Sequence, residues 1–171
     1  MLEVIILAAG QGRRMQSSLP KVLHTLAGQP LVVHVLERAR KLGAQQIHVV
    51  VGHGAEAVEA TVSAGDVQCH LQAEQWGTGH AVQQAIDACQ ADSTVLVLFG
   101  DVPLIADQTL HKVISAAKTG VAMLSANLEN PSGYGRVERD LQGEFIAVVE
   151  EKDATEAQRQ LTEINTGVLA S

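Results

Sequence analysis

Short apolar runs alternate with amphipathic segments along the whole chain. A nearly continuous apolar run predicts a buried strand, and apolar residues that recur every three or four positions predict a helix packed through one face. The predicted strands are residues 3–8, 46–51, 67–71, 94–99, 121–127, 136–139, 145–150 and 164–169. The predicted helices are residues 31–42, 55–63, 78–89, 107–118 and 155–160. Because the two kinds of segment alternate at this spacing, we expect an α/β fold with a parallel sheet and helices on both faces.

The loop after the first predicted strand has the most distinctive chemistry in the chain. It reads L-A-A-G-Q-G-R-R-M, and Lys21 follows a little further on. Glycine lets backbone N–H groups approach phosphate oxygens closely, and Arg and Lys neutralise phosphate charge. A loop of about twenty residues precedes the next helical pattern. Loops of that length inside a compact domain are usually functional or disordered, and the charge, glycine and two prolines of this one favour function. This segment therefore predicts a cradle for a polyphosphate.

Two common phosphate-binding motifs are excluded at this loop. A dinucleotide fingerprint, G-x-G-x-x-G, would need glycine where Met15 stands, and a P-loop would need G-K-[ST] at a fixed spacing from the first glycine. A dinucleotide-dependent dehydrogenase is therefore disfavoured.

Charge is unevenly distributed along the 171 residues, whose net charge is −7. Residues 1–41 hold six Lys or Arg and two Glu, whereas residues 42–111 hold eight acids and no Lys or Arg. We therefore expect no nucleic acid as partner, and a small anionic ligand at one basic loop fits better. No apolar run is long enough to span a membrane, so no membrane partner is expected. Cys69 and Cys89 lack metal-type spacing and predict free thiols in a reducing cytoplasm.

Polar residues follow several predicted strands, at the edge where a parallel sheet binds ligands. Asp101 comes directly after residues 94–99, and a carboxylate near phosphates suits Mg²⁺. The alternative is an Asp that only satisfies a turn before Pro103. Arg14 and Lys21 would stabilise charge in phosphoryl transfer. Solvated surface cations are the alternative for either residue taken alone.

The segment Q-A-E-Q-W-G-T-G-H, which follows residues 67–71, is a further candidate. The amide of Gln72 can bond a donor and an acceptor on a base edge, and Gly77 permits a close backbone approach. The alternative is an ordinary strand-to-helix turn with Thr78 as the N-cap. Asp107 is likewise predicted to cap its helix. Trp76 is expected to have a packing role, with stacking on a ligand as the alternative.

Weaker candidates lie in the last third of the chain. Gly135, Glu150 and Asn165 can bond sugar hydroxyls or an acetamido group, although G-Y-G is often only a turn and E-E-K-D is usually a solvated face. The histidines show no ligand spacing, and no Ser–His–Asp or Cys–His arrangement stands out. Covalent catalysis is therefore not indicated.

The segment L-A-A-G-Q-G-R-R-M-x-S-x-x-P-K resembles the signature of the nucleoside-diphosphate-sugar pyrophosphorylases. L-Q-A-E-Q-x-G-T-G-H-A, G-D-V-P-L, P-x-G-Y-G-R, V-E-x-K-D-A-T and E-I-N-T-G resemble one branch of it. That branch comprises bifunctional bacterial enzymes that acetylate glucosamine 1-phosphate and join N-acetylglucosamine 1-phosphate to UTP. The resemblance implies a Rossmann-like, three-layer α/β/α fold with a mostly parallel, mixed sheet, and Mg²⁺ as cofactor.

The resemblance also implies a role for each matching residue. The implied catalytic residues are Arg14, Lys21 and Asp101, with Asp101 as the Mg²⁺ ligand. The implied substrate-binding residues are Leu7, Ala8, Ala9, Gly10, Lys21, Gln72, Gly77, Thr78, Phe99, Gly100, Asp101, Gly135, Glu150 and Asn165. Among these, Gln72 and Gly77 would read uracil, and the last three would hold the amino sugar. Phe99 departs from the family, in which a tyrosine can precede this G-D.

The implied partners are UTP, N-acetylglucosamine 1-phosphate, UDP-N-acetylglucosamine and pyrophosphate, in the synthesis of cell-envelope precursors. Full-length family members form a homotrimer through a left-handed β-helix that carries the acetyltransferase site. We expect residues 1–171 to form the uridyltransferase domain, incomplete at its C-terminus and without that β-helix.

Two alternatives stay open. The chain can be a pyrophosphorylase for another sugar or nucleotide, although L-Q-A-E-Q and E-I-N-T-G argue for uridine and the N-acetyl sugar. It can also be an inactive fragment that only binds nucleotide.

Overall fold

A computed structural model describes residues 1–12, 15 and 17–171 of the chain. The chain forms two compact units: unit 1 comprises Met1–Ala122 and Leu169–Ser171, and unit 2 comprises Met123–Val168.

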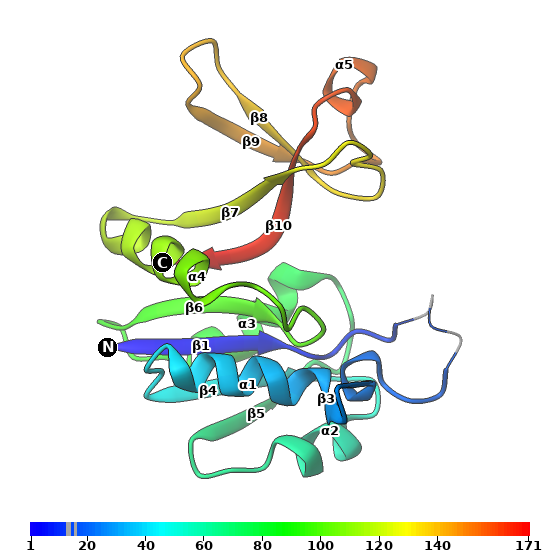
Figure 1. Cartoon of the computed structure of the whole chain (residues 1–171), viewed down its shortest axis with the longest axis vertical. Coiled ribbons are helices and arrows are strands. Elements are labelled where there is room, and N and C mark those ends of the chain that lie inside the picture. Colours follow the sequence, from blue (N-terminus) through cyan, green and yellow to red (C-terminus); the bar gives the residue numbers. More distant parts are fainter. Residues whose placement is uncertain (13–14, 16) are drawn as a thin grey trace. The chain divides into compact units, whose positions relative to one another are not determined.

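Unit 1 is built on a mostly parallel sheet (Figure 1). Its parallel strands are β1 (Leu2–Leu7), β4 (Gln46–Val51), β5 (Val67–Leu71) and β6 (Thr94–Phe99), in the order β5–β4–β1–β6. The last residues of β10 (Glu163–Ala170) pair with β6 in the antiparallel sense. The predicted Rossmann-like fold class, with a mixed and mostly parallel sheet, is confirmed.

Helices cover both faces of this sheet. They are α1 (Leu31–Lys41), α2 (Ala55–Val62), α3 (Thr78–Ile86) and α4 (Asp107–Ala116), the last continued by η3 (Ala117–Thr119). Figure 1 shows α1 and α3 on opposite faces. The core on the α3 side consists of Ile5, Leu7, Ala9, Val50, Ala81, Ala85, Val95 and Val97. β1 is therefore covered on both sides, which explains why its sequence is almost continuously apolar. In the described part of the chain, no helix is both long enough and apolar enough to cross a membrane.

Unit 2 consists of antiparallel strands and one short helix. Strands β8 (Arg136–Arg139) and β9 (Phe145–Val149) form the predicted hairpin, and β8 also pairs with β10. β7 (Ala122–Asn127) pairs with β10. Helix α5 (Glu156–Arg159) begins at Thr155, whose side chain makes a reciprocal capping box with Gln158.

The prediction of one continuous loop between β1 and α1 is wrong in its second half. This segment contains the 3₁₀ turn η2 (Lys21–Leu23) and a small hairpin of β2 (Thr25–Leu26) and β3 (Gln29–Pro30). The two residues between these strands have φ angles of 51° and 84°, as a tight hairpin turn requires. The alanine at the first of these positions hid that turn from the sequence pattern.

Both predicted helix caps are wrong. The N-cap of α3 is Gly77, with a φ of 106°, and Thr78 is the first helical residue. Asp107 lies in the first turn of α4, after the N-cap residue, and its carboxylate pairs with the guanidinium of Arg38 on α1. A charge-assisted bond to arginine competes for the oxygens that a cap would offer to backbone N–H groups. Helix α3 also ends at Ile86, three residues before the predicted end.

Candidate nucleotide-binding pocket

A pocket of about 690 Å³ opens in unit 1, at the carboxyl ends of the parallel strands. It is lined by Leu7, Ala8, Ala9, Gly10, Gly12, Met15, Lys21, Val22, Gln72, Gln75, Gly77, Thr78, Ala81, Phe99 and Asp101. These residues come from the segment after β1, the segment from β5 into α3, and the end of β6. The prediction that these three groups meet at one edge of the sheet is confirmed.

Backbone hydrogen bonds hold the strand ends under this pocket. The N–H of Ala8 donates to the carbonyl oxygen of Val50 at 2.8 Å, and the N–H of Gly100 donates to that of Leu7 at 2.9 Å. Gly100 is buried behind the lining residues, where an added Cβ would lie 3.1 Å from a methyl carbon of Val22. Gly100 therefore supports the pocket wall from behind.

Glycines also let the loop after β1 pack closely on its neighbours. Gly12 has a φ of 60°, and an added Cβ would lie 2.8 Å from the Cβ of Lys21. Gly54, which follows β4, has a φ of 66°, and its added Cβ would lie 2.4 Å from Pro20. The loop is thus held against the β4–α2 turn at positions where a side chain does not fit.

Lys21 and Asp101 form an ion pair in the pocket. Lys21 is the first residue of η2, and Asp101 follows β6. Their side chains are 36% and 19% exposed, so both remain accessible to a ligand. Among the described residues that line the pocket, this is the one pair of opposite charges. The carboxylate is a hard oxygen ligand of the kind that Mg²⁺ takes together with substrate phosphate oxygens.

The side chain of Gln72 is fixed beside the start of α3. Gln72 is only 3% exposed, and its Nε2 donates to the carbonyl oxygen of Gly77 at 3.2 Å and contacts Nδ1 of His80 at 3.1 Å. An amide nitrogen has two hydrogens, so these contacts occupy the donor side of the amide. The Oε1 acceptor is then the group that Gln72 can offer to a ligand.

Trp76 does not have the packing role expected of it. Its side chain is 76% exposed, and its ring lies over that of His80 with 5.0 Å between the ring centroids. The turn before α3 turns this indole outward, next to residues that line the pocket.

Unit 2 brings together the three residues that the sequence proposed for sugar binding. The N–H of Asn165 donates to the carbonyl oxygen of Gly135 at 2.9 Å, and an added Cβ on Gly135 would lie 3.3 Å from Oε1 of Glu150. Oδ1 of Asn165 accepts from the N–H of Gly167 at 2.8 Å, which leaves its amide nitrogen as a donor. The three residues thus form one polar group within unit 2.

The sequence did not point to some of the residues that line the pocket, and one predicted site residue is not among the described residues. Met15, Val22 and Ala81 line the pocket, but their apolar side chains carry no chemical signal. Gln75 also lines it and was not singled out, although its amide is as capable of hydrogen bonding as that of Gln72. Arg14, predicted to face phosphates, lies outside the described residues.

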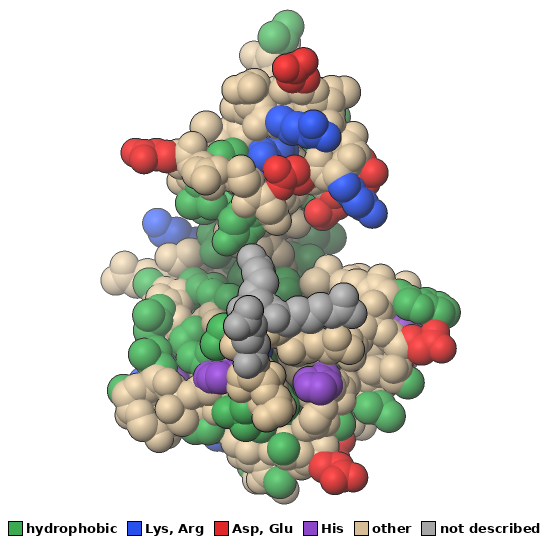
Figure 2. All heavy atoms as spheres, turned by 90° about the vertical axis from the view of Figure 1, so that its right-hand side faces the viewer, with side chains coloured by type: hydrophobic (Ala, Val, Ile, Leu, Met, Phe, Trp, Pro, Cys, Tyr) green, Lys and Arg blue, Asp and Glu red, His purple; other side chains and the backbone are tan. Residues whose placement is uncertain are grey.

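On the face of unit 1 that Figure 2 turns toward the viewer, uncharged and hydrophobic side chains predominate, with two patches of histidine. Of the described pocket-lining residues, Lys21 is the one cation.

Comparisons with known proteins agree with this geometry. The chain is 52% identical over 171 residues to the bifunctional protein GlmU of Cellvibrio japonicus, and 53% identical to that of Chromohalobacter salexigens. Each match covers 99% of this chain and 38% of the relative, so the chain spans well under half the length of these curated relatives.

Solved structures show the same fold at low sequence identity. A putative glucose-1-phosphate thymidylyltransferase from Bacillus anthracis superposes with a TM-score of 0.83 at 18% identity, over 99% of this chain and 71% of that one. HddC from Yersinia pseudotuberculosis, in a complex with GMP-PN, gives 0.73 at 22% identity, over 99% of this chain and 76% of that one. Residues 4–163 match the family described as the MobA-like NTP transferase domain. The chain therefore belongs to the family of MobA-like NTP transferase domains.

Proposed function

We propose that this chain is a nucleotidyltransferase that joins N-acetylglucosamine 1-phosphate to UTP, giving UDP-N-acetylglucosamine and pyrophosphate. The observation that carries the proposal is the Lys21–Asp101 pair, placed in one pocket between the glycine loop and the Gln72 segment. The identity to two GlmU proteins over nearly the whole chain supports the choice of substrates.

The reaction is an in-line displacement at phosphorus. A phosphate oxygen of the sugar phosphate attacks the α-phosphorus of UTP, the new P–O bond forms, and the bond to the β-phosphate oxygen breaks as pyrophosphate leaves. The nucleophile is already anionic, so no general base is required. Catalysis rests on positioning and on charge stabilisation.

Lys21 and the glycine loop supply that stabilisation from the protein. The ammonium of Lys21 neutralises negative charge on the departing pyrophosphate. Among the described residues, no atom lies within 4 Å of an added Cβ on Gly10, so its backbone faces space that a phosphate can enter. Arg14 is proposed as a second cation on the phosphates.

Asp101 would hold Mg²⁺, whose other ligands would be water and substrate phosphate oxygens. When bound, the ion supplies Lewis-acid stabilisation of phosphoryl charge. Until then the ammonium of Lys21 neutralises the Asp101 carboxylate, so the ion pair keeps both side chains in the pocket.

Recognition of uracil is assigned to Gln72 and Gly77, with Thr78 beside them. With its amide hydrogens engaged, Gln72 offers an acceptor, which suits the N3–H donor of uracil; the ring N3 of cytosine has no hydrogen to donate. Gly135, Glu150 and Asn165 are proposed to bind the amino sugar. A cytoplasmic location, a role in cell-envelope precursor synthesis and a homotrimer in the full-length protein remain predictions from the family resemblance.

Pyrophosphate release tests the proposal. We expect release from UTP and N-acetylglucosamine 1-phosphate that requires Mg²⁺ and falls at least about 100-fold in Asp101→Ala, since removing one group that stabilises developing charge costs about that much. Lys21→Ala should lower kcat more than it raises the KM for the sugar phosphate. Asp92→Ala is the matched control, because Asp92 precedes the opposite end of the same strand, β6.

The outcomes separate the alternatives. Faster pyrophosphate release with another nucleotide or sugar phosphate would show that this other compound, and not the proposed one, is the substrate. If UDP-N-acetylglucosamine raises the Tm of the chain but no pyrophosphate is released, the chain is a module that binds nucleotide without turnover. An Asp101→Ala variant that keeps most of the rate would remove Asp101 from the mechanism.

A further inference from the structure

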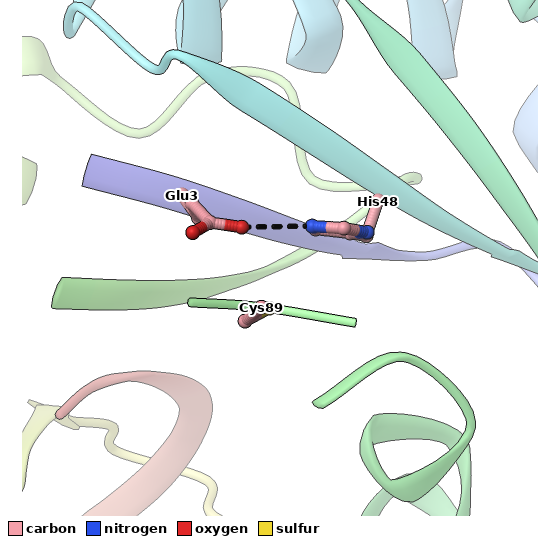
Figure 3. A group of neighbouring side chains, drawn as sticks. All are labelled: Glu3, His48 and Cys89. Carbon is pink, nitrogen blue, oxygen red and sulfur yellow. Dashed lines mark hydrogen bonds and ion pairs between the residues drawn. The ribbon is translucent and has the colours of Figure 1, made fainter. Parts of the chain in front are cut away.

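A second group of ionisable side chains lies in unit 1, toward the amino ends of the strands and away from the pocket. Glu3 is on β1, His48 is on β4, and Cys89 follows the end of α3. Their ligand atoms all lie within 4.8 Å of one another. Figure 3 shows the Glu3 carboxylate directed at the His48 ring, with Cys89 beside them. The proposed reaction uses none of these residues.

This group is an unusual occupant of a protein core. The side chains of Glu3 and His48 are 2% and 1% exposed, and charged or polar groups are buried at a cost unless they are paired or coordinate a metal. Nε2 of His48 lies 3.0 Å from the Glu3 carboxylate, and the N–H of Gln90 donates to the other Glu3 oxygen at 2.9 Å. Both oxygens of the Glu3 carboxylate are therefore held in place, one of them at the His48 ring.

We propose that Glu3, His48 and Cys89 form a binding site for one divalent cation of the Zn²⁺ type. A carboxylate oxygen, an imidazole nitrogen and a thiolate are the three kinds of ligand that Zn²⁺ takes in proteins. In a tetrahedral site the ligand atoms lie about 3.5 Å apart. The three side chains would therefore need to move only slightly closer together to bind one ion. Three protein ligands leave a fourth position for water.

The surroundings of His48 suit a metal ligand. Nδ1 of His48 lies 3.0 Å from Nε2 of His70 on β5. A metal-bound histidine usually donates its other ring N–H to a nearby acceptor, which fixes the tautomer and the ring orientation. His70 can be that acceptor, because its Nε2 lies within hydrogen-bond distance of Nδ1 of His48.

The site differs in chemistry from the Mg²⁺ site proposed in the pocket. Sulfur and imidazole ligands select Zn²⁺ or a similar transition metal, whereas Mg²⁺ takes oxygen ligands. A cysteine binds a metal as its thiolate, so metal binding would release the thiol proton of Cys89, and affinity would fall at lower pH. A bound ion would link the end of α3 to β1 and β4.

Metal binding by the reduced, tag-free chain tests the proposal. We expect one equivalent of Co²⁺ to give a thiolate-to-cobalt charge-transfer absorption, which Zn²⁺ displaces, and one equivalent of Zn²⁺ to raise Tm. Cys89→Ser should abolish the absorption and weaken Zn²⁺ binding at least about 100-fold, and His70→Gln should weaken it about 10- to 100-fold. Cys69→Ser is the matched control, because Cys69 pairs in register with Val49, one residue from His48, and so lies on the other face of the sheet.

Each result decides for or against the site. Binding that is kept in Cys69→Ser and Asp101→Asn but lost in Cys89→Ser supports it. No charge-transfer absorption from folded wild-type protein, or equal Zn²⁺ affinity in Cys89→Ser, overturns it and leaves a hydrogen-bonded Glu3–His48–His70 chain that only stabilises the fold.

Discussion

Single residues determine whether the loop after β1 can form its pocket wall. Gly12 combines a left-handed backbone conformation with a contact to the side chain of Lys21. A side chain at this position is therefore disfavoured twice, once by the backbone and once by the space. Gly10, two residues earlier, has neither restriction among the described residues. The lack of a side chain at Gly10 therefore matters for a ligand that approaches the loop from outside.

Gly12→Ala should lower the free energy of unfolding by about 1–3 kcal/mol, the usual cost of a strained backbone residue. It should also lower activity, because the added Cβ would push the side chain of Lys21 out of its place. Urea unfolding and pyrophosphate release measure the two effects. Gly65→Ala is the control, since none of the described atoms lies within 4 Å of its added Cβ and its φ lies outside the left-handed region; equal stability of the two variants would contradict the prediction.

At the scale of elements, one ion pair and the serine hydroxyl bonded to it link three strands of unit 2. Arg139 on β8 makes two hydrogen bonds of 2.8 Å with Glu163 on β10, and Ser125 on β7 donates to the same carboxylate at 2.6 Å. Arg139, followed by Ser125, lowers the pKa of Glu163 from its usual 4.5 to about 2. The strands are thereby linked through side chains as well as through backbone pairing.

The stability of unit 2 should depend on pH through Glu163. Its pKa in the folded state lies below that of the unfolded chain, so the contribution is complete above pH 4.5 and is lost as pH falls toward 2. Urea unfolding of wild type and Glu163→Gln across this range measures it. The difference in the free energy of unfolding between wild type and Glu163→Gln should shrink with falling pH. The difference for Glu129→Gln, at an exposed position, should show no such trend. A difference that is constant with pH would refute the assignment.

At the scale of the whole molecule, the two units differ in how well their strands are buried. Val4, Ile5 and Ile6 of β1 have no exposed surface, whereas Phe145 and Ile146 of β9 are each 54% exposed. Local opening is easiest where few apolar groups are buried. Unit 1 therefore provides the stable part of the fold, and it contains both the pocket and the proposed metal site.

Hydrogen exchange should resolve this difference. We expect backbone amides of β8 and β9 to exchange at least roughly tenfold faster than those of β1, β4 and β6 under native conditions. Mass spectrometry of peptides from the intact chain measures both sets in one experiment. Equal protection in the two units would show that they open as one cooperative body.

Much of the fold and of the pocket could be predicted from the sequence, because the signals are local. Buried strands read as apolar runs, and the polar residues that follow them, such as Asp101 and Gln72, meet wherever parallel strands end together. The cradle loop carries its own glycines and cations. The cap at Asp107 could not be predicted, because its competing partner Arg38 comes from another element.

The sequence by itself determined the strand and helix pattern, the glycine loop and the family resemblance, since each depends on residues close together in the chain. Only the tertiary structure decided which distant side chains touch. Lys21 of the turn η2 meets Asp101 after β6, and Glu3 meets His48 of the neighbouring strand and the segment at Cys89. Such contacts follow from the packing of several elements at once, and no local pattern records them.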